Sequence, residues 1–372
     1  MTHAHMNIEF FNTYISPDAS KMVNDVLRST FLSEGKITEQ FENELRRTFG
    51  FKHVVALNSG TSALHLALDL LDVGEGDEVI IPPQTFIATG LAVLYCKAKP
   101  VFADINYEDG NLNVDSVSSK ITPNTKAIIN VDWGGYPSDL HALSDLVKNT
   151  GIKLIDDAAH ALGAVYRNSN VGTLADITCF SFQAIKHLTT GDGGAITLHD
   201  DSLYEKARSK KWFGIDRNNS PVSELGERAY DLKEIGFKYH LNNFASALGL
   251  ANLTGYHDRL AKRRKIAAYY ENELKDVENI SLFNYEPDRT SAYWLFGFHC
   301  KSREQLIRKL KDHGVPSSVV HQRIDKYSVF GGTDHSLKNM NRFNETQLHI
   351  PIHDAVSEEA AEYIVRAIKN AN

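Results

Sequence analysis

Residues 177–198 read ITCFSFQAIKHLTTGDGGAITL, in which one lysine and a glycine-rich break separate two apolar runs. The runs at 177–182 and 194–198 are short and apolar, as the strands of a buried sheet are. Lys186 directly follows an apolar pair, where a charged side chain is costly unless it reaches water or takes part in chemistry. The sequence around this stretch decides between these two possibilities.

Strand and helix patterns alternate regularly on both sides of Lys186. Apolar residues recur at helical spacing at 61–71 and 138–151. Short apolar runs typical of strands occur at 53–59, 77–86, 99–104, 125–132 and 153–160. Alternation of this kind predicts an α/β fold with a mainly parallel central sheet and helices on both faces.

The chain of 372 residues is long for one domain and predicts a large unit followed by a smaller one. Long helical patterns cover 245–274, and the sequence from 293 to 371 then shows a strand pattern followed by further helical patterns. We therefore expect a large domain over residues 1–255, including the N-terminal segment, and a small α+β domain over residues 256–372.

Composition argues against several classes of protein. The formal net charge of −7 disfavours nucleic acid as a partner, and no apolar run approaches the ~20 residues that cross a bilayer. The N-terminus lacks the basic and apolar regions of a signal peptide. Cys96, Cys179 and Cys300 are odd in number and far apart, which argues against a disulfide framework and against a metal site. We expect a soluble cytoplasmic protein without a membrane partner.

Candidate binding residues stand at the ends of two predicted strands. The sequence has neither a G-x-G-x-x-G turn nor a Walker lysine loop, so the two commonest nucleotide sites lose their support. Residues 58–62, NSGTS, end a strand and begin a helix, where amides and small hydroxyls suit a phosphate group or form a plain N-cap. Asp156 and Asp157 end another strand and face opposite ways, so one can serve a ligand while the other caps or faces elsewhere.

These features together meet the requirements of one cofactor. A lysine amine can condense with a carbonyl, an aspartate can keep a pyridine nitrogen protonated, and a helix N-terminus can hold a phosphate. Pyridoxal phosphate needs all three, because its ring acts as an electron sink only while its nitrogen keeps the proton. We therefore expect Lys186 to be the lysine that forms a Schiff base with pyridoxal phosphate.

Four motifs follow one another along the chain. They are NSGTSAL at 58–64, GEGDEVIIPPQTFIAT at 74–89, DDAAH at 156–160 and SF-x-x-x-K-x-x-x-x-GDGG at 181–194. In this order and spacing the sequence resembles the DegT/DnrJ/EryC1/StrS family of pyridoxal-phosphate-dependent sugar aminotransferases, and the likeness runs nearly from end to end. The resemblance implies the aspartate-aminotransferase fold, fold type I, and usually a homodimer with active sites shared across the interface.

The resemblance also implies roles for individual residues. Lys186 matches the lysine bound to the cofactor, Asp157 the acid paired with the pyridine nitrogen, and His160 the residue beside the ring hydroxyl. Phe86 matches the aromatic side chain that stacks on the ring face. The phosphate contacts of the family correspond to Gly60, Thr61, Ser62 and Ser181.

Two further segments are implied to contact cofactor or substrate. In GFKYHLNN, residues 236–243, Lys238 and His240 match positions that reach a phosphate in the other subunit, and His240 departs from the residues that relatives usually carry there. His187 and His321 lie where relatives approach the substrate. A lone histidine in a loop, however, is usually just solvated.

The implied reaction is a transamination in two halves. An amino acid, with L-glutamate as the expected donor, converts the cofactor to pyridoxamine phosphate, and a keto group of a nucleotide-linked deoxysugar then receives the amine. Lys186 would move the proton, which requires a pKa lowered towards the working pH. Amino sugars of this kind serve the biosynthesis of surface polysaccharides such as lipopolysaccharide.

Three rival activities share parts of the pattern. A sugar dehydratase branch of the same family replaces the lysine with histidine, whereas here position 186 is lysine and His187 merely follows it. A lyase or desulfurase acting on amino acids would usually want a mobile catalytic cysteine, and the cysteines of this chain stand in apolar contexts. A non-catalytic regulator that binds the cofactor would have little need for both Lys186 and Asp157. We therefore expect an aminotransferase.

Overall fold

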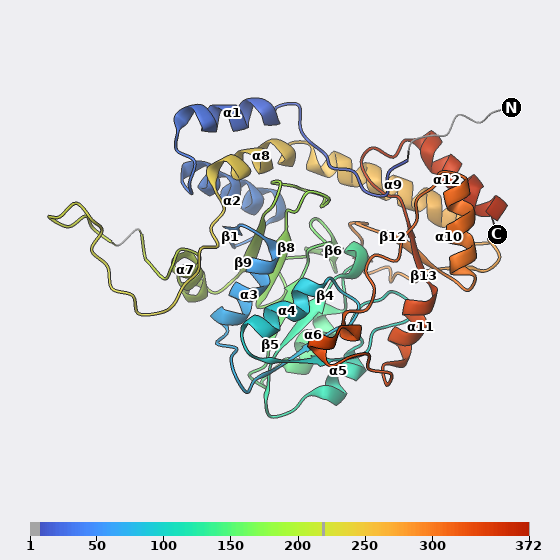
Figure 1. The fold of residues 1–372 in the computed structure, drawn as a ribbon, viewed down its shortest axis with the longest axis horizontal. Coiled ribbons are helices and arrows are strands. Elements are labelled where there is room, and N and C mark those ends of the chain that lie inside the picture. The colour runs from blue at the N-terminus through green and yellow to red at the C-terminus, as the bar shows by residue number, and fades with distance from the viewer. Residues whose placement is uncertain (1–7, 218–219, 372) are drawn as a thin grey trace.

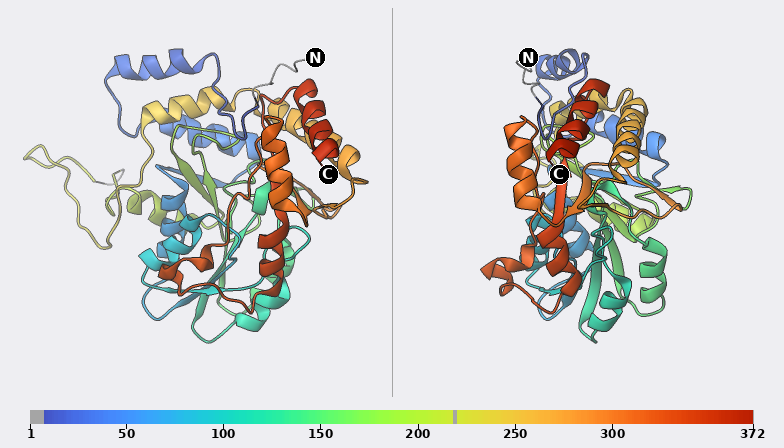
Figure 2. Two further views of the ribbon diagram at one scale, coloured as in Figure 1. Left: turned by 45° about the vertical axis from the view of Figure 1, so that its right-hand side comes forward. Right: turned by 90° about the vertical axis from the view of Figure 1, so that its right-hand side faces the viewer.

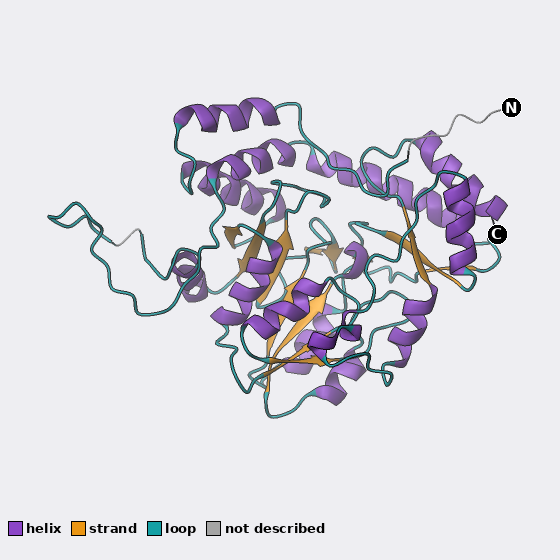
Figure 3. Ribbon diagram, in the orientation of Figure 1, coloured by secondary structure: helices purple, strands orange, loops and turns teal. Residues whose placement is uncertain are grey.

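The structure is a computed structural model that describes residues 8–217 and 220–371 (Figure 1). A seven-stranded sheet flanked by helices lies at its centre (Figure 3). From edge to edge its strands are β1 (His53–Leu57), β9 (Gly194–Leu198), β8 (Ile177–Ser181), β5 (Lys153–Asp157), β4 (Thr125–Val131), β2 (Glu78–Ile81) and β3 (Lys99–Phe102). Strand β9 runs antiparallel to both of its neighbours, and the other pairings in this sheet are parallel. The α/β fold with a mainly parallel sheet, predicted from the alternation, is confirmed.

Helices cover both faces of the sheet, because successive side chains of a strand point to opposite faces and join different apolar cores. On β1, Val55 and Leu57 belong to one core, while Val54 and Ala56 belong to another. The first face is covered by α3 (Gly60–Leu70), α4 (Ile87–Tyr95) and α7 (Asp201–Lys210). The opposite face is covered by α2 (Lys36–Phe49), α5 (Val114–Lys120), α6 (Leu140–Val147) and α8 (Asn243–Leu253).

A second, antiparallel sheet and three helices gather at one side of the large sheet (Figure 2). The strands in spatial order are β10 (Ile280–Leu282), β12 (Phe296–Cys300) and β13 (Gln347–Ile350). The helices are α9 (Tyr256–Leu274), α10 (Arg303–Asp312) and α12 (Glu358–Ala371). These elements share an apolar core of their own, which Ile8 of the N-terminal segment also contacts.

The predicted domain boundary after residue 255 falls at a turn between α8 and α9. Gly255 forms this turn with a φ of +67°, a backbone angle that glycine adopts readily. Helix α9 then contributes to both cores: Tyr256 and Leu260 join the core of the large sheet, and residues 266–274 join that of the small sheet. Because one helix belongs to both units, the division into two domains stays a prediction.

Several shorter elements complete the fold. A third, small sheet consists of β11 (Arg289–Thr290), β6 (Val165–Tyr166) and β7 (Ser169–Asn170). The remaining helical elements are α1 (Ala19–Ser29), α11 (Lys338–Thr346), η1 (Trp133–Gly135), η2 (Ile324–Lys326) and η3 (Ser328–Phe330). Between α7 and α8 the chain extends far from the body of the molecule, at the left of Figure 1. In the part of the chain that the structure describes, no helix combines the length and apolarity needed to cross a membrane.

Candidate active site

A cavity of about 290 Å³ lies where β4, β5 and β8 end. Val131, Asp157 and Ser181, the last residues of these three strands, all line it. The carboxyl ends of parallel strands are where open α/β sheets bind their ligands. The residues predicted from the sequence that line the cavity are Gly60, Thr61, Phe86, Asp157, His160, Ser181, Lys186 and His321.

The N-terminus of α3 forms one part of the cavity wall. Ser59 caps this helix, since its Oγ accepts a hydrogen bond from the Ser62 amide at 3.0 Å. The amides of Gly60 and Thr61 belong to the first turn, which has no intrahelical acceptors for them. A Cβ added at Gly194 would lie 2.5 Å from Ser59 O, so only glycine lets β9 approach this turn so closely. The result is an amide-lined pocket with the positive end of a helix dipole, which suits a phosphate.

Ser62 does not line the cavity, although the motif places it among the phosphate contacts. Its hydroxyl donates a hydrogen bond to Asn58 Oδ1 at 2.6 Å, and its amide serves the Ser59 cap. Both polar groups of Ser62 therefore stabilise the turn that presents Gly60 and Thr61. A direct phosphate contact by Ser62 stays a prediction.

Asp157 and Asp156 point to different environments, as the two-residue period of a strand requires. Asp157 lines the cavity, and its Oδ2 accepts a hydrogen bond from the Thr89 hydroxyl at 2.7 Å. Burial raises the pKa of Asp157, while the Thr89 hydrogen bond acts in the opposite direction. Asp156 is fully buried away from the cavity, where Asn130 Nδ2 donates to its Oδ1 at 2.8 Å. Only Asp157 therefore faces a ligand.

Lys186 lies in the loop between β8 and β9 and lines the same cavity as Asp157. Part of its side chain is open to the cavity, yet the surrounding protein removes the amine from bulk water. This burial lowers the pKa of Lys186 to about 7, and the charge of Asp157 acts in the opposite direction. An amine with such a pKa can be neutral or protonated near pH 7, which an acid–base catalyst needs.

Aromatic rings surround the lysine and the aspartate. His160 lies parallel to Trp294 with 3.8 Å between ring centroids, and burial lowers the pKa of His160 well below its usual value. Phe86, directly before α4, is 51% exposed, so its ring is free to pack on a ligand. The ring centroids of His321 and Phe86 lie 5.0 Å apart, and burial lowers the pKa of His321 to about 4. Both histidines are therefore neutral near pH 7.

Three other predicted residues lie outside the cavity. His187 is buried and its Nε2 lies 2.8 Å from the carbonyl oxygen of Ala292. Lys238 Nζ lies 3.6 Å from the ring centroid of Trp212, and His240 packs edge-on against the same ring at 4.2 Å. Their roles toward substrate and phosphate stay predictions.

Among the cavity residues that sequence reasoning missed, two have side chains that contact Lys186 or Asp157. Trp294 lines the cavity from the segment before β12. In the sequence this tryptophan is only part of a strand pattern. Thr89 belongs to the PPQTFIAT motif, and its hydroxyl orients Asp157. A polar residue within that motif was the available signal for Thr89, whereas the pattern around Trp294 offers none.

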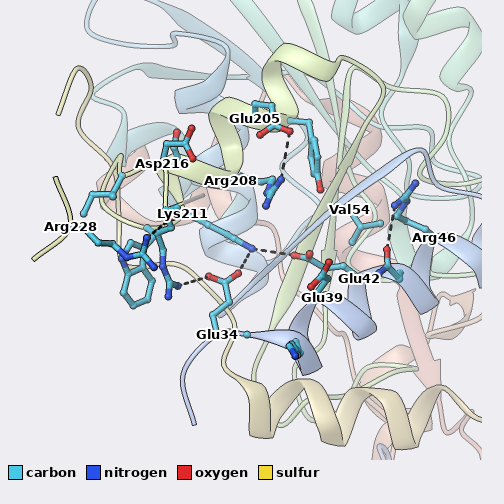
Figure 4. A pocket seen from close by; sticks show the side chains of 18 residues that line it. Glu34, Glu39, Glu42, Arg46, Val54, Glu205, Arg208, Lys211, Asp216 and Arg228 are labelled. Carbon is cyan, nitrogen blue, oxygen red and sulfur yellow. Dashed lines mark hydrogen bonds and ion pairs between the residues drawn. The ribbon is translucent and has the colours of Figure 1, made fainter. Parts of the chain in front are cut away.

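A larger cavity of about 740 Å³ lies between α2, α7 and the extended segment, away from Lys186 (Figure 4). Several of its charged side chains pair with one another. Lys211 Nζ lies 2.5 Å from Glu34 Oε1 and 3.1 Å from Glu42 Oε1, and Arg217 also approaches Glu34 (Figure 4). Because these charges neutralise each other, the smaller cavity with Lys186 and Asp157 is the candidate active site.

The smaller cavity fits pyridoxal phosphate by its chemistry. It offers helix amides and the Ser181 hydroxyl for a phosphate, a carboxylate for a ring nitrogen, an exposed aromatic ring and an amine with a lowered pKa. Gly60 lets the start of α3 approach Ser181, since a Cβ there would lie 3.0 Å from Ser181 Cβ. Among the described residues, no group of His, Cys, Asp and Glu gathers as a metal site.

Such a sheet and cavity define the class of fold-type-I enzymes that use pyridoxal phosphate. Comparison with known proteins narrows the class. The chain belongs to the DegT/DnrJ/EryC1/StrS aminotransferase family, whose model matches residues 13–369. The protein is a pyridoxal-phosphate-dependent transaminase.

Individual proteins of known sequence or structure are similar to this chain over nearly its whole length. GDP-perosamine synthase from Caulobacter vibrioides is 32% identical over 355 residues, which cover 93% of each chain. The sugar aminotransferase CalS13 from Micromonospora echinospora has a TM-score of 0.93 at 33% identity, over 98% of this chain and 99% of that one. Spr1654 from Streptococcus pneumoniae, solved in PMP-form, has a TM-score of 0.91 at 27% identity over 98% and 99% of the two chains. The family, fold, enzyme class and cofactor expected from the sequence are confirmed.

Proposed function

We propose that this transaminase moves an amino group from L-glutamate to a keto group of a nucleotide-linked deoxysugar. The observation that carries the proposal is that Lys186 and Asp157 line one cavity with the free amides at the start of α3. Support for a nucleotide-linked sugar comes from relatives named for such products, among them the GDP-perosamine synthase. The enzyme would make this amino sugar in the cytoplasm. The amino sugar would then serve the biosynthesis of a surface polysaccharide such as lipopolysaccharide.

Several residues of the cavity would hold the cofactor. The amides of Gly60 and Thr61 and the hydroxyl of Ser181 would bind the phosphate, aided by the helix dipole. Asp157 would accept a hydrogen bond from the ring nitrogen, and Thr89 keeps its carboxylate in place. The remaining contacts are those of His160, which would donate to the ring hydroxyl, and Phe86, whose exposed ring would pack on the ring face.

Lys186 is the residue that would move the proton. When bound, pyridoxal phosphate supplies the electron sink that makes the Cα proton of the amino acid acidic. The neutral Lys186 Nζ would take that proton from Cα and, as the protonated amine, would deliver it to C4′ of the cofactor, so that Lys186 is neutral again. In the other half of the reaction Lys186 would move a proton in the reverse direction. A pKa of about 7 leaves both forms available at neutral pH, because burial opposes the charged form. His321, which lines the cavity, would contact the substrate, whereas a substrate contact by His187 would require it to leave its buried position outside the cavity.

We also propose a homodimer whose subunits share their active sites. The segment between α7 and α8 extends from the body of the molecule and exposes apolar side chains, with Leu225 91% and Ile235 82% exposed. Apolar side chains exposed to this degree on an extended arm are typical of a surface that is buried against a partner. In such a dimer Lys238 and His240 would face the phosphate held by the other chain.

The test is a screen of keto-sugar nucleotides with L-glutamate, with the product analysed by NMR. An amine on the sugar and an equal amount of 2-oxoglutarate would support the proposal, and Lys186→Ala serves as the inactive control. Loss of a sugar hydroxyl without gain of an amine would instead identify a dehydratase. The absence of any visible cofactor band would instead point to a non-catalytic regulator.

A further inference from the structure

Trp294 brings the lysine and the histidine of the cavity into contact with one aromatic side chain. The indole is buried, with 1% of the residue exposed, and it lines the cavity. Lys186 Nζ lies 3.8 Å from its ring centroid, close enough for a cation–π interaction. His160 stacks on the indole with 11° between the ring planes, and Phe11 stacks at 5.1 Å between centroids. The indole therefore connects both residues to the N-terminal segment.

Backbone contacts fix the indole in this position. Trp294 Nε1 donates a hydrogen bond to the carbonyl oxygen of Ile185 at 3.1 Å, which ties the indole to the backbone beside Lys186. Tyr293, directly before it, has a φ of +50°, which is rare for an aromatic residue and indicates local strain. The Tyr293 hydroxyl holds that conformation by donating to Glu271 Oε1 at 2.7 Å.

Gly135, the last residue of η1, makes room for this backbone. Gly135 has a φ of +97°, and a Cβ there would lie 2.6 Å from His160 O and 3.0 Å from Trp294 N. The Ala292 amide donates to the Gly135 carbonyl oxygen at 2.8 Å. The position of Trp294 therefore depends on contacts from several parts of the chain, as the position of a functional side chain often does.

The charges that act on the Lys186 amine are few. Asp157 on β5 favours the protonated amine. The charge of Lys186 acts on His160, His187 and His321, but burial lowers the pKa of each histidine, so they are neutral near pH 7 and add no charge beside the amine. Among the protein side chains, the Trp294 indole is a second favourable partner for the ammonium group, and the pairing of Asp157 with a cofactor ring nitrogen would not remove it.

We propose that Trp294 is a positioning residue whose indole face holds the Lys186 ammonium group whenever that amine is not bonded to the cofactor. The inference rests on the proposed role of Lys186. The cation–π contact stabilises the protonated amine against the cost of burial, and the hydrogen bond to Ile185 keeps the indole beside it. Trp294 thereby keeps the protonated lysine at the cavity and prevents it from turning out to solvent.

The test measures the pKa of Lys186 in the full-length enzyme loaded with pyridoxamine phosphate, which has no aldehyde to bond the lysine. Competitive labelling with acetic anhydride across the pH range, with the Lys186 peptide quantified by mass spectrometry, gives that pKa without any turnover. Trp294→Leu should lower it by roughly 0.5 to 1.5, because the charged form loses its cation–π partner. Trp294→Phe should lower it less, since a smaller aromatic face remains.

Trp212→Leu is the matched control, because Lys238 Nζ lies 3.6 Å from that indole, outside the cavity. It should leave the pKa of Lys186 unchanged. If the pKa of Lys186 is unchanged or raised in both Trp294 variants, the inference is overturned. If the leucine variant fails to fold, the result for Trp294→Phe decides by itself. Borohydride reduction of the enzyme loaded with pyridoxal phosphate distinguishes failure of the proposed role of Lys186 from failure of the proposed role of Trp294. A label on another lysine refutes the role of Lys186. A label on Lys186, together with an unchanged pKa of Lys186 in the variants, refutes only the role of Trp294.

Discussion

Asp157→Asn tests the site sharply, because Asp156 beside it provides a matched control. Both are buried acids at the end of β5. Asp157 accepts a hydrogen bond from Thr89 inside the cavity, whereas Asp156 accepts one from Asn130 on the other side of the strand. Asparagine keeps the size of the side chain and one oxygen acceptor but removes the negative charge. Both substitutions therefore remove one carboxyl group, in Asp157→Asn inside the cavity and in Asp156→Asn outside it.

The expected magnitudes follow from these environments. A hydrogen bond to a charged group contributes about 1.5–3 kcal/mol, so Asp157→Asn should weaken cofactor binding by roughly 10- to 150-fold. At saturating cofactor its turnover should still fall by roughly two orders of magnitude or more, because the ring nitrogen loses the anion that keeps it protonated. Burial raises the pKa of Asp156 well above its ordinary value, which favours its neutral form. Asparagine imitates that neutral form, and turnover should change little.

The assay compares both variants with the wild-type enzyme in three measurements. Cofactor affinity comes from the visible absorbance during titration, turnover from glutamate-dependent product formation at saturating cofactor, and folding from thermal unfolding. A large loss for Asp157→Asn with a nearly intact Asp156→Asn supports the assignment. Equal impairment of the two variants, or wild-type turnover in Asp157→Asn, would refute the reasoning from strand geometry.

Three further predictions concern the lysine, the buried acid and the shared site. Lys186→Ala should abolish turnover while the protein stays folded, and borohydride reduction of the wild type should label Lys186; a label on a different lysine contradicts this. Because the folded state holds the Asp156 proton to higher pH than the unfolded state does, that acid contributes less stability as pH rises above about 4. Urea unfolding should therefore show Asp156→Asn gaining stability relative to wild type as pH rises, and a constant difference would argue against the raised pKa. Mixing Lys186→Ala with a Lys238→Ala/His240→Ala double variant should restore roughly a quarter of wild-type activity, since half of the dimers are mixed and each then has one intact site. Recovery no greater than the sum of the two variants alone would show that residues 236–243 serve their own subunit.

Local patterns were enough to predict the sheet and the chemistry of the site. The apolar runs and helical spacings are properties of short segments, so their alternation indicates an α/β fold wherever the segments pack. The strand period separates Asp156 from Asp157 for the same reason. The residues at the start of α3 also follow from local chemistry, because a serine before a helix caps it and leaves the next amides free.

Contacts between distant segments depend on tertiary packing alone. Trp294 meets Lys186 and His160 only because the chain before β12 packs against the turn at Gly135. No periodicity in the sequence indicates that contact, because a pattern shows which face of an element is buried but not which residues of other elements lie against it. In the same way only the packing brings Lys238 onto the ring of Trp212. The sequence by itself therefore determines the elements and the reactive groups, whereas the tertiary structure decides which side chains surround them, since that depends on how the layers pack.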